Sequence, residues 1–555
     1  MKMSEIHKYY GGPVHASTGP HYFKQITNLK VPALYLKYNS FPDCYDKEVE
    51  ERKGEYMFKR EEFERVTPES VGIGSKDIEW LLDRLESGFT EPHGLMIMRH
   101  GKICAEGWWN PYAPGIRHGE QSHSKTYAAT AVGIAYTEGL LSLDERIIDI
   151  FPEEAPLEPT ENLCKLTVRD VLCMGCGMDE MPKPSQDWIR DFLHTPVTHV
   201  PGSAFMYNSV GSSLLGAIVR KKSGMGLHAY LKPRLYDKIG IFADNHRWMH
   251  LPDGMEVGGG GLYATTEDNL RLMKLYADGG VWNGEMILAP EYVEQATSLQ
   301  NDSATEALNN PPAKDNFVGY GYQIWMCRPQ GVYRADGAMG QFTIVAPNQD
   351  MIIAITENAS GAHWAQTTLD TMWEFLDRIT ANSAEKEDEQ AAGHLKRRME
   401  RLALPCPVYA PFQPVQEKIA GRIYCVKSGY FTLSDAGVGH MMAAALLPEG
   451  ISRFSFAFFS DSCVFTYQAS EEQEQAVIAL DGSRRWNKLK GAVAEQALMS
   501  GAWIGEKQFE ITIRRIETCA EEKMVFAFDG DEVTISVTGN VIFGNNYGRI
   551  VAQAE

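Results

Sequence analysis

The chain has 555 residues, which is too long for one ordinary hydrophobic core, so we expect two or three domains. Its 44% hydrophobic and 23% charged residues are typical of a globular protein. Lys and Arg total 53 against 73 Asp and Glu, and the net charge of -20 opposes binding to a phosphate backbone, so we expect no nucleic-acid partner.

The start of the chain and its cysteines indicate a compartment. The first residues, M-K-M-S-E-I-H-K-Y-Y, lack an apolar signal segment, and no run of about 18 apolar residues occurs, so we expect a soluble, cytoplasmic protein with no membrane partner. The ten scattered cysteines suit reduced thiols. Cys173 and Cys176 form a C-x-x-C without a second ligand pair, so we expect two small apolar side chains in a tight loop and no metal or organic cofactor.

The first predicted elements are an extension, a helix and a hairpin. Residues 1–63 show no sustained period, and we interpret them as an N-terminal extension that packs on the main domain. Residues 66–85 predict a helix, because Pro and Ser precede apolar residues spaced at 3.6. Residues 94–109, G-L-M-I-M-R-H-G-K-I-C-A-E-G-W-W, alternate around a His-Gly turn and predict a β-hairpin.

A serine and a lysine stand at the start of the next predicted helix. In Q-S-H-S-K-T-Y, residues 121–127, Ser122 and Lys125 have the i, i+3 spacing that puts two side chains on one helix face. The pair is either a solvated helix start or half of a nucleophile and base arrangement, because an unassisted serine hydroxyl is too weakly acidic to attack. The spacing alone does not decide between these readings.

The chain then continues as helices and turns to about residue 300, after which strands return. Residues 319–327 and 340–357 predict strands, the latter two runs joined through a P-N-Q-D turn. Strands at both ends with helices between them predict an α+β fold, in which one antiparallel sheet carries an inserted helical subdomain. We expect the functional site in the cleft between these parts.

The remaining residues predict a linker and a second domain. Residues 386–415 combine a charged helix pattern with the Pro-rich P-C-P-V-Y-A-P-F-Q-P. Short β runs separated by Asp-Gly turns fill residues 416–555, which predict a separate all-β domain, a barrel of lipocalin-like type or a sandwich. The main domain is accordingly assigned to residues 64–385.

Three motifs in order carry a family resemblance. Ser122 and Lys125 are followed by P-G-S-A-F-M-Y-N-S-V-G-S-S-L-L-G (201–216) and by Y-R-A-D-G-A-M-G-Q-F (333–342). Together they resemble the motifs of the serine β-lactamase and penicillin-binding-protein superfamily, in its class C, esterase and D-aminopeptidase-like branch. The resemblance runs from about residue 64 to about residue 380 and implies a β-lactamase/DD-peptidase-like fold.

The resemblance also implies roles for individual residues. It makes Ser122 the nucleophile of an acyl-enzyme, Lys125 the group that moves its proton, and Tyr207 the general base and acid. The backbone N–H groups of Ser122 and Ala338 would form the oxyanion hole. His123, between the motif residues, is expected to be a packing or rim residue.

Two departures from the family pattern bear on the substrate. Ser209 stands where the family prefers Asn, and Ala335, followed by Asp336 and Gly337, replaces the lysine that helps hold a substrate carboxylate. Penicillin-like carboxylates should therefore bind poorly. Asp336 would favour neutral esters, amides or substrates with a free amine, unless it points away or pairs with Arg334.

The function implied is a serine hydrolase that cleaves a small ester, amide or short peptide, without being an efficient β-lactamase. The alternative is a non-catalytic, penicillin-binding-protein-like peptide binder or sensor on the same scaffold, and a third reading makes the C-terminal domain a ligand-binding barrel. Retention of Ser122, Lys125 and Tyr207 together favours catalysis. A homo-oligomer is compatible with the sequence, which does not name the substrate.

Overall fold

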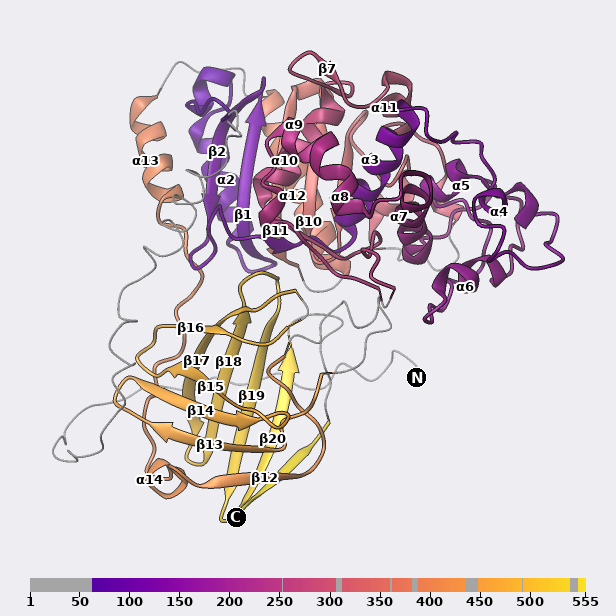
Figure 1. Cartoon of the computed structure of the whole chain (residues 1–555). Helices are drawn as coiled ribbons and strands as arrows, with labels where there is room; N and C mark the ends of the chain where they lie inside the picture. Colours follow the sequence, from indigo (N-terminus) through magenta and orange to yellow (C-terminus); the bar gives the residue numbers. More distant parts are fainter. Residues whose placement is uncertain are drawn as a thin grey trace. The chain divides into compact units, whose positions relative to one another are not determined.

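The computed structural model of the chain describes residues 62–251, 253–305, 312–359, 362–381, 388–434, 448–491, 493–539 and 548–555. Figure 1 draws the helices and strands with the labels used below. The predicted N-terminal extension, residues 1–63, lies outside the described residues except for its last two. All the elements below belong to one folded unit, Phe58–Glu555.

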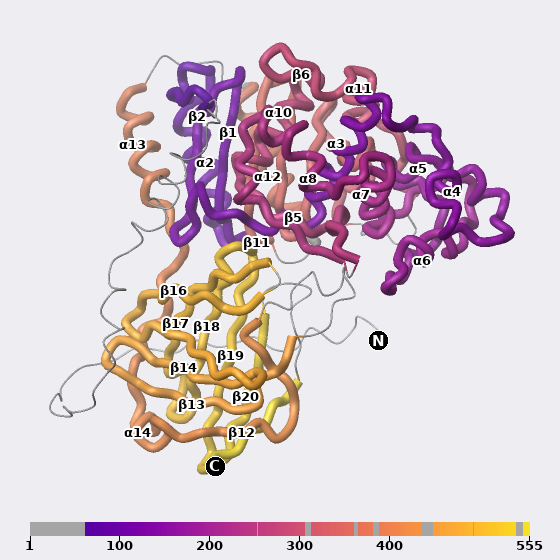
Figure 2. The backbone as a smooth tube through the Cα atoms, in the orientation of Figure 1, coloured from indigo at the N-terminus to yellow at the C-terminus, as the bar shows by residue number. Residues whose placement is uncertain are grey.

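The central sheet has six antiparallel strands in the order β2-β1-β11-β10-β9-β8. They are β1 (Glu91–Arg99), β2 (Lys102–Trp108), β8 (Trp325–Met326), β9 (Tyr333–Gly337), β10 (Gln341–Ala346) and β11 (Met351–Asn358). Because β1 pairs with β11, the first and last strands of residues 91–358 lie side by side, as Figure 2 shows. The prediction of one antiparallel sheet built from both ends is confirmed.

Both predicted turns have the backbone that their residues favour. His100 and Gly101, between β1 and β2, take φ values of 52° and 73°, and positive φ at both central residues matches the twist of a hairpin. Between β10 and β11, Pro347–Gln349 forms a short 3₁₀ turn and Asp350 takes a φ of 48°. Asp tolerates this left-handed conformation better than a branched residue does.

Helices cover both faces of the sheet. Alternate residues of a strand point to opposite faces, and here both sets are apolar and pack against helices. On one face, Leu95, Ile97 and Ile353 pack against three helices. These are α2 (Ser75–Leu85), α12 (Ala362–Ala381) and α13 (Glu389–Met399). On the other face, Met96 and Ile352 pack against the helical subdomain, in which α10 (Thr266–Ala277) contacts β1, β10 and β11.

The rest of the helical subdomain holds the segments that carry the sequence motifs. Its helices are α3 (Ser124–Thr137), α4 (Ile147–Ile150), α5 (Val168–Leu172), α6 (Trp188–His194), α7 (Ser209–Ser223), α8 (Leu227–Leu231), α9 (Asp237–Ile239) and α11 (Pro290–Ala296). Its short strands are β3 (His118–Gly119), β4 (Arg247–Trp248), β5 (Leu262–Ala264), β6 (Val281–Trp282) and β7 (Glu285–Met286). β5 lies between β3 and β4 in a small sheet next to the start of α3.

The strand predicted over residues 319–327 is wrong for most of its length. Only β8 is a strand, and the residues before it form a loop. A Cβ on Gly321 would lie 2.0 Å from the carbonyl oxygen of Ala296, and Gln323 adopts a φ of 56°. Close backbone packing against the end of α11 shapes this segment, and that contact has no signature in a local sequence pattern.

The C-terminal part is a closed β-barrel, so the barrel prediction is confirmed and the sandwich alternative is wrong. Among the described residues nine strands form a ring that closes by pairing β15 with β17, and β16 pairs with β17. The elements are α14 (Gln416–Ile419), β12 (Ile423–Ser428), β13 (Arg453–Phe458), β14 (Ser462–Gln468), β15 (Gln473–Ala479), β16 (Arg485–Lys488), β17 (Gln496–Gly505), β18 (Gln508–Arg515), β19 (Glu521–Asp529), β20 (Glu532–Gly539) and β21 (Ile550–Ala554).

Aromatic rings occupy the interior of this barrel. Phe456 lies 5.1 Å from Phe465 and from Phe526 and 5.8 Å from Phe509, measured between ring centroids. All four rings are buried. The contacts with Phe526 and Phe509 are edge-to-face, which is favourable at these distances and typical of a packed core, so the interior is built as a core. The boundaries at residues 64, 386 and 416 stay predictions.

Candidate active site

Ser122 and Lys125 are in direct contact. Lys125 Nζ lies 2.9 Å from Ser122 Oγ, which confirms the proximity that the i, i+3 spacing predicts. Ser122 does not lie in α3, however, but in a 3₁₀ turn, Gln121–His123, immediately before it. Side chains three residues apart eclipse in a 3₁₀ turn, so the contact survives the change of helix type.

The backbone before α3 presents Ser122 and buries its neighbours. Gln121 has a φ of 49°, a left-handed conformation that a non-glycine residue adopts only when its surroundings hold it there. Ser124 supplies part of that hold, because its Oγ donates to the Gln121 carbonyl at 2.6 Å and accepts the Leu262 N–H at 3.0 Å. Ser122 is half-buried, whereas Gln121 and His123 are buried. The turn therefore leaves the serine hydroxyl reachable.

Lys125 is almost completely buried, with 1% of its surface exposed. Desolvation disfavours the ammonium and lowers the pKa of Lys125 from 10.5 to about 7, although nearby Asp336 opposes the shift. The amine also donates to the carbonyl oxygen of Gly259. A lysine with this pKa is half neutral near pH 7, so it can accept a proton from Ser122.

Tyr207 lies next to this pair. The Lys125 Nζ is 4.8 Å from the centroid of the Tyr207 ring, and that ring stacks on Trp325 with centroids 5.6 Å apart. Phe205 and Tyr320 complete an apolar cluster with Trp325 against which Tyr207 packs. Lys125 from the first motif and Tyr207 from the second thus lie together, and buried aromatic packing holds the tyrosine in place.

The C-x-x-C loop supports the Tyr207 segment. Cys173 and Cys176 are free thiols and both are buried, in agreement with the apolar interpretation. Between them, the Met174 carbonyl accepts the Met206 N–H at 3.0 Å. A Cβ on Gly175 would lie 2.9 Å from the Gly202 Cα, so this loop can approach the P-G motif only with glycine at that position.

Asn208 and Ser209 occupy the start of α7, where the family pattern places its amide. Asn208 is the N-cap of the helix, and its Oδ1 accepts the Gly211 N–H at 2.9 Å. Ser209 is the first helical residue, and its carbonyl oxygen would lie 2.2 Å from a Cβ on Gly259. Ser209 therefore packs against the same loop whose carbonyl accepts a hydrogen bond from Lys125.

Asp336 pairs with Arg334, the arrangement that the sequence left open. Both lie on β9, and the Arg334 Nε donates to Asp336 Oδ2 at 2.7 Å. Arg334 is fully buried, also donates to Asn316 Oδ1 at 2.8 Å, and lies 5.5 Å above the Trp325 ring. Burial raises the pKa of Asp336, while Arg334 and then Lys125 oppose that rise. Its charge is thus shared between two cations.

The turn after β9 approaches the serine through two glycines. A Cβ on Gly337 would lie 2.2 Å from the Glu120 carbonyl oxygen, two residues before Ser122. Gly340 has a φ of 92°, and a Cβ there would lie 2.0 Å from Glu357 Oε1. Ala338 lies between these two close contacts. Glycine at position 337 lets the end of β9 approach the Ser122 segment, and glycine at position 340 leaves room for the Glu357 carboxylate. Ala335, in the middle of β9, is buried.

His123 is a packing residue. It is fully buried, and its Nε2 lies 3.0 Å from Thr343 Oγ1 on β10. Desolvation lowers the pKa of His123 to about 4, so the ring is neutral near pH 7. This matches the role expected for it.

Three contributors to the site were missed in the sequence. The Gly259 carbonyl was overlooked because a backbone oxygen has no side-chain signal, although the G-G-G-G run at residues 258–261 marks a close approach. Nothing in the sequence marks Trp325, the first residue of β8, as the ring under Tyr207. The sequence offers Arg334 as a partner for Asp336, but it does not show that the buried guanidinium also binds Asn316.

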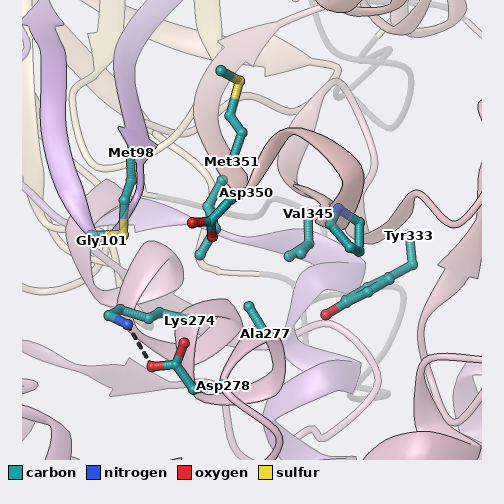
Figure 3. Close-up of a pocket in the computed structure, with 11 residues that line it drawn as sticks. Met98, Gly101, Lys274, Ala277, Asp278, Tyr333, Val345, Asp350 and Met351 are labelled. Carbon is teal, nitrogen blue, oxygen red and sulfur yellow. Dashed lines mark hydrogen bonds and ion pairs between the residues drawn. The ribbon is translucent and has the colours of Figure 1, made fainter. Parts of the chain in front are cut away.

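A pocket of about 150 Å³, drawn in Figure 3, lies elsewhere on the sheet. It is lined by Tyr333, Val345 and Met351 among others, which stand at the start of β9, the end of β10 and the start of β11. Ala335–Gly337 end β9 on the far side.

Within the described part of the chain, no three His, Cys, Asp or Glu side chains group as metal ligands would. No helix there is long and apolar enough to cross a bilayer.

The chain is similar to several known proteins. A 6-aminohexanoate-dimer hydrolase of Paenarthrobacter ureafaciens is 24% identical over 296 residues, which cover 49% of this chain and 74% of that protein. A penicillin-binding protein homologue from Caulobacter crescentus aligns at 16% identity with a TM-score of 0.46, over 57% of this chain and 99% of that one. An octameric penicillin-binding protein homologue from Pyrococcus abyssi aligns at 16% identity with a TM-score of 0.43, over 86% and 99%.

The sequence model of one family, Beta-lactamase, matches residues 82–371. This range covers more than half of the chain. It contains the Ser122, Tyr207 and β9 segments in the order of the three motifs. The chain therefore belongs to the β-lactamase family, in the superfamily of serine β-lactamases and penicillin-binding proteins.

Proposed function

We propose that the protein is a serine hydrolase that cleaves an ester or amide through an acyl-enzyme on Ser122. The observation that carries the proposal is the contact between a half-buried serine hydroxyl and a buried lysine, with Lys125 Nζ 2.9 Å from Ser122 Oγ. A lysine kept buried away from solvent has no role as a surface charge. Next to a hydroxyl it acts as a base, because desolvation brings its pKa to about 7.

Acylation begins with proton transfer from Ser122. The neutral amine of Lys125 accepts the hydroxyl proton while Ser122 Oγ attacks the substrate carbonyl carbon, and Tyr207, beside the amine, relays that proton to the leaving group. The C–O or C–N bond then breaks, and the alcohol or amine leaves with the proton. The Gly259 carbonyl keeps the amine pointed at the serine throughout.

Deacylation reverses the roles. A water molecule gives a proton to the same Lys125 and Tyr207 pair and attacks the acyl carbon, which releases the carboxylic acid and returns a proton to Ser122. In both steps the N–H groups of Ser122 and Ala338 stabilise the oxyanion, and each such donor is worth about 10² to 10³ in rate.

The substrate class follows from the charges on β9. Arg334 and Asp336 neutralise each other, and Ala335 replaces the lysine of the family motif, so β9 offers no unpaired cation for a substrate carboxylate. We therefore assign neutral esters and amides as the preferred class, because the pairing of Asp336 with Arg334 removes the reason to expect a preference for a substrate amine. The enzyme would be a poor β-lactamase.

Labelling with a fluorophosphonate tests the proposal. Intact-mass spectrometry should find one adduct per chain in the wild type and none in Ser122→Ala. A wild-type chain that stays unlabelled while it binds short peptides would instead support the non-catalytic binder. Comparing p-nitrophenyl esters that differ only in a terminal amide or carboxylate tests the substrate class, and faster hydrolysis of the carboxylate would contradict it.

A further inference from the structure

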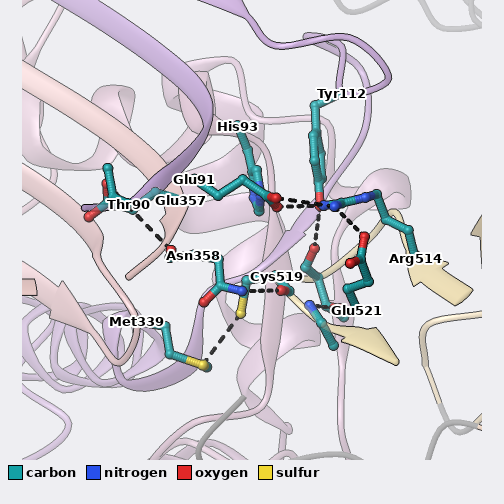
Figure 4. Close-up of polar contacts among 12 residues, drawn as sticks. Thr90, Glu91, His93, Tyr112, Met339, Glu357, Asn358, Arg514, Cys519 and Glu521 are labelled. Atoms are coloured by element: carbon teal, nitrogen blue, oxygen red, sulfur yellow. Dashed lines mark hydrogen bonds and ion pairs between the residues drawn. The ribbon is translucent and has the colours of Figure 1, made fainter. Parts of the chain in front are cut away.

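One turn of the barrel contacts the helix-and-sheet region close to both proposed oxyanion donors. The turn, residues 516–520, joins β18 to β19. The Glu517 carbonyl accepts the Gly119 N–H at 2.8 Å, and the Cys519 carbonyl accepts from Asn358 Nδ2 at 3.0 Å. Cys519 Sγ also lies 3.5 Å from Met339 Sδ (Figure 4). The turn therefore touches segments that are more than two hundred residues apart in the sequence.

The first of these segments leads directly into Ser122. Gly119 ends β3, a strand of only two residues that pairs with β5. So short a strand makes few hydrogen bonds with β5, and the hydrogen bond from the Gly119 N–H to the Glu517 carbonyl is a second contact that holds it. The Glu517 carboxylate adds a third contact, because it lies 2.5 Å from the guanidinium of Arg117.

The second segment carries Ala338. Its neighbour Met339 has a φ of 65°, and its side chain is 3% exposed. A non-glycine residue in this conformation is strained and persists only where the surroundings hold it. The Met339 carbonyl accepts the Ala359 N–H at 2.9 Å, and the thiol of Cys519 packs on its side chain. The barrel thus supplies one wall of the strained turn.

The hairpin that bears this turn is itself anchored to the sheet. Arg514, which is buried, bonds to both oxygens of Glu91 on β1 and to Glu521 on the next strand of the barrel (Figure 4). The Tyr112 hydroxyl donates to the Thr518 carbonyl at 3.0 Å. Buried ion pairs contribute little net stability but fix one relative placement of two elements.

We propose that turn 516–520 is a positioning element of the acyl-transfer site. It fixes the backbone at Gly119 and Met339, and through them the separation of the Ser122 and Ala338 N–H groups. The inference rests on the proposed function, since it assigns these groups as oxyanion donors. The barrel then contributes to turnover through the backbone of the other region and not by touching substrate. An offset of about 1 Å between reacting groups can lower the rate by about 10², so loosening this turn should measurably lower the acylation rate.

Two glutamates of the same hairpin provide a matched comparison. Glu517 pairs with Arg117, across to the helix-and-sheet region, and accepts the N–H groups of Glu495 and Gln496. Glu522 is also buried but pairs with Arg515 inside the barrel. Glu517→Ala should lower the single-turnover acylation rate for p-nitrophenyl acetate about tenfold, with the substrate dissociation constant within twofold. Glu522→Ala should change neither more than twofold, at a similar loss of thermal stability.

Two cysteines give a second comparison in case Glu517→Ala does not fold. Cys519 and Cys463 are both buried thiols outside any disulfide, but Cys463 lies in the barrel core. Cys519→Ala should slow acylation at least threefold, and Cys463→Ala should not. Equal rates within both pairs would overturn the inference. Acylation of the wild type that is lost in Ser122→Ala would support the proposed function whatever the barrel variants do. Failure of the inference can therefore be told apart from failure of the proposed function.

Discussion

The charge of Asp336 should set the pH at which the enzyme becomes active. Lys125 must be neutral to accept the Ser122 proton, and burial lowers its pKa from 10.5 to about 7. Asp336 opposes that shift by stabilising the ammonium. The kcat/KM of the wild type should therefore rise with pH through about 7 and level off above it, because the base form is the active form.

Asp336→Asn removes the opposing charge without changing side-chain size. It also removes the carboxylate to which Arg334 donates at 2.7 Å, so the positive charge of Arg334 is less compensated in the variant. Both effects disfavour the ammonium, so the pKa of Lys125 should fall. A charge within 4 to 6 Å shifts a pKa by about 1 to 3 units, and we expect a fall of about one unit because Asp336 already shares its charge with Arg334.

The assay is the pH profile of kcat/KM for a neutral p-nitrophenyl ester between about pH 5 and 9. In Asp336→Asn the rising limb should move to lower pH by about one unit, so relative activity at pH 6 increases. Asp350→Asn, an exposed residue in the turn before β11, is the matched control and should leave the limb in place. A limb that stays fixed or moves to higher pH in Asp336→Asn would refute the assignment of Lys125 as the base.

Three further substitutions test the packing around the site. Gly337→Ala should cut acylation at least tenfold while the protein stays folded, because its Cβ would lie 2.2 Å from the Glu120 carbonyl and must push β9 away; an unchanged rate would contradict this. Glu357→Gln should gain stability relative to wild type by about 3 to 4 kcal/mol as pH rises from 5 to 8 in urea unfolding. Burial raises the pKa of Glu357 from 4.5 in the unfolded chain to about 8 in the folded protein. Between pH 5 and 8 the unfolded chain therefore binds fewer protons than the folded protein, and the free energy of unfolding of the wild type falls as pH rises. A difference in unfolding free energy between variant and wild type that does not change with pH would refute this reading. Asn208→Ala should cost about 1 kcal/mol through the lost cap on the Gly211 N–H, and a thermal midpoint equal to that of the wild type would count against it.

The sequence predicts much of the fold because several signals are local. The alternation around His100 and Gly101 and the Pro347–Asp350 turn each specify a hairpin through a few neighbouring residues. The strand expected over 319–327 fails because that segment is shaped by contact with the end of α11, and a Tyr-rich alternation does not encode such a contact.

The candidate site shows the same division. The i, i+3 spacing is enough to predict that Ser122 and Lys125 touch. The sequence does not predict the acceptor for Lys125, because the Gly259 carbonyl is a backbone group brought in by a distant loop. Nor does it choose between the two readings of Asp336, since only the fold shows that Arg334, two residues away on the same strand face, is buried beside it.

The most direct measurement of the central claim is a burst experiment with an activated ester. Wild-type protein mixed with excess p-nitrophenyl ester should release about one equivalent of p-nitrophenol per chain in a fast phase, and peptide mapping of the quenched sample should place the acyl group on Ser122. Ser122→Ala should give no burst. A burst of equal size in that variant, or an acyl group on another residue, would contradict the account.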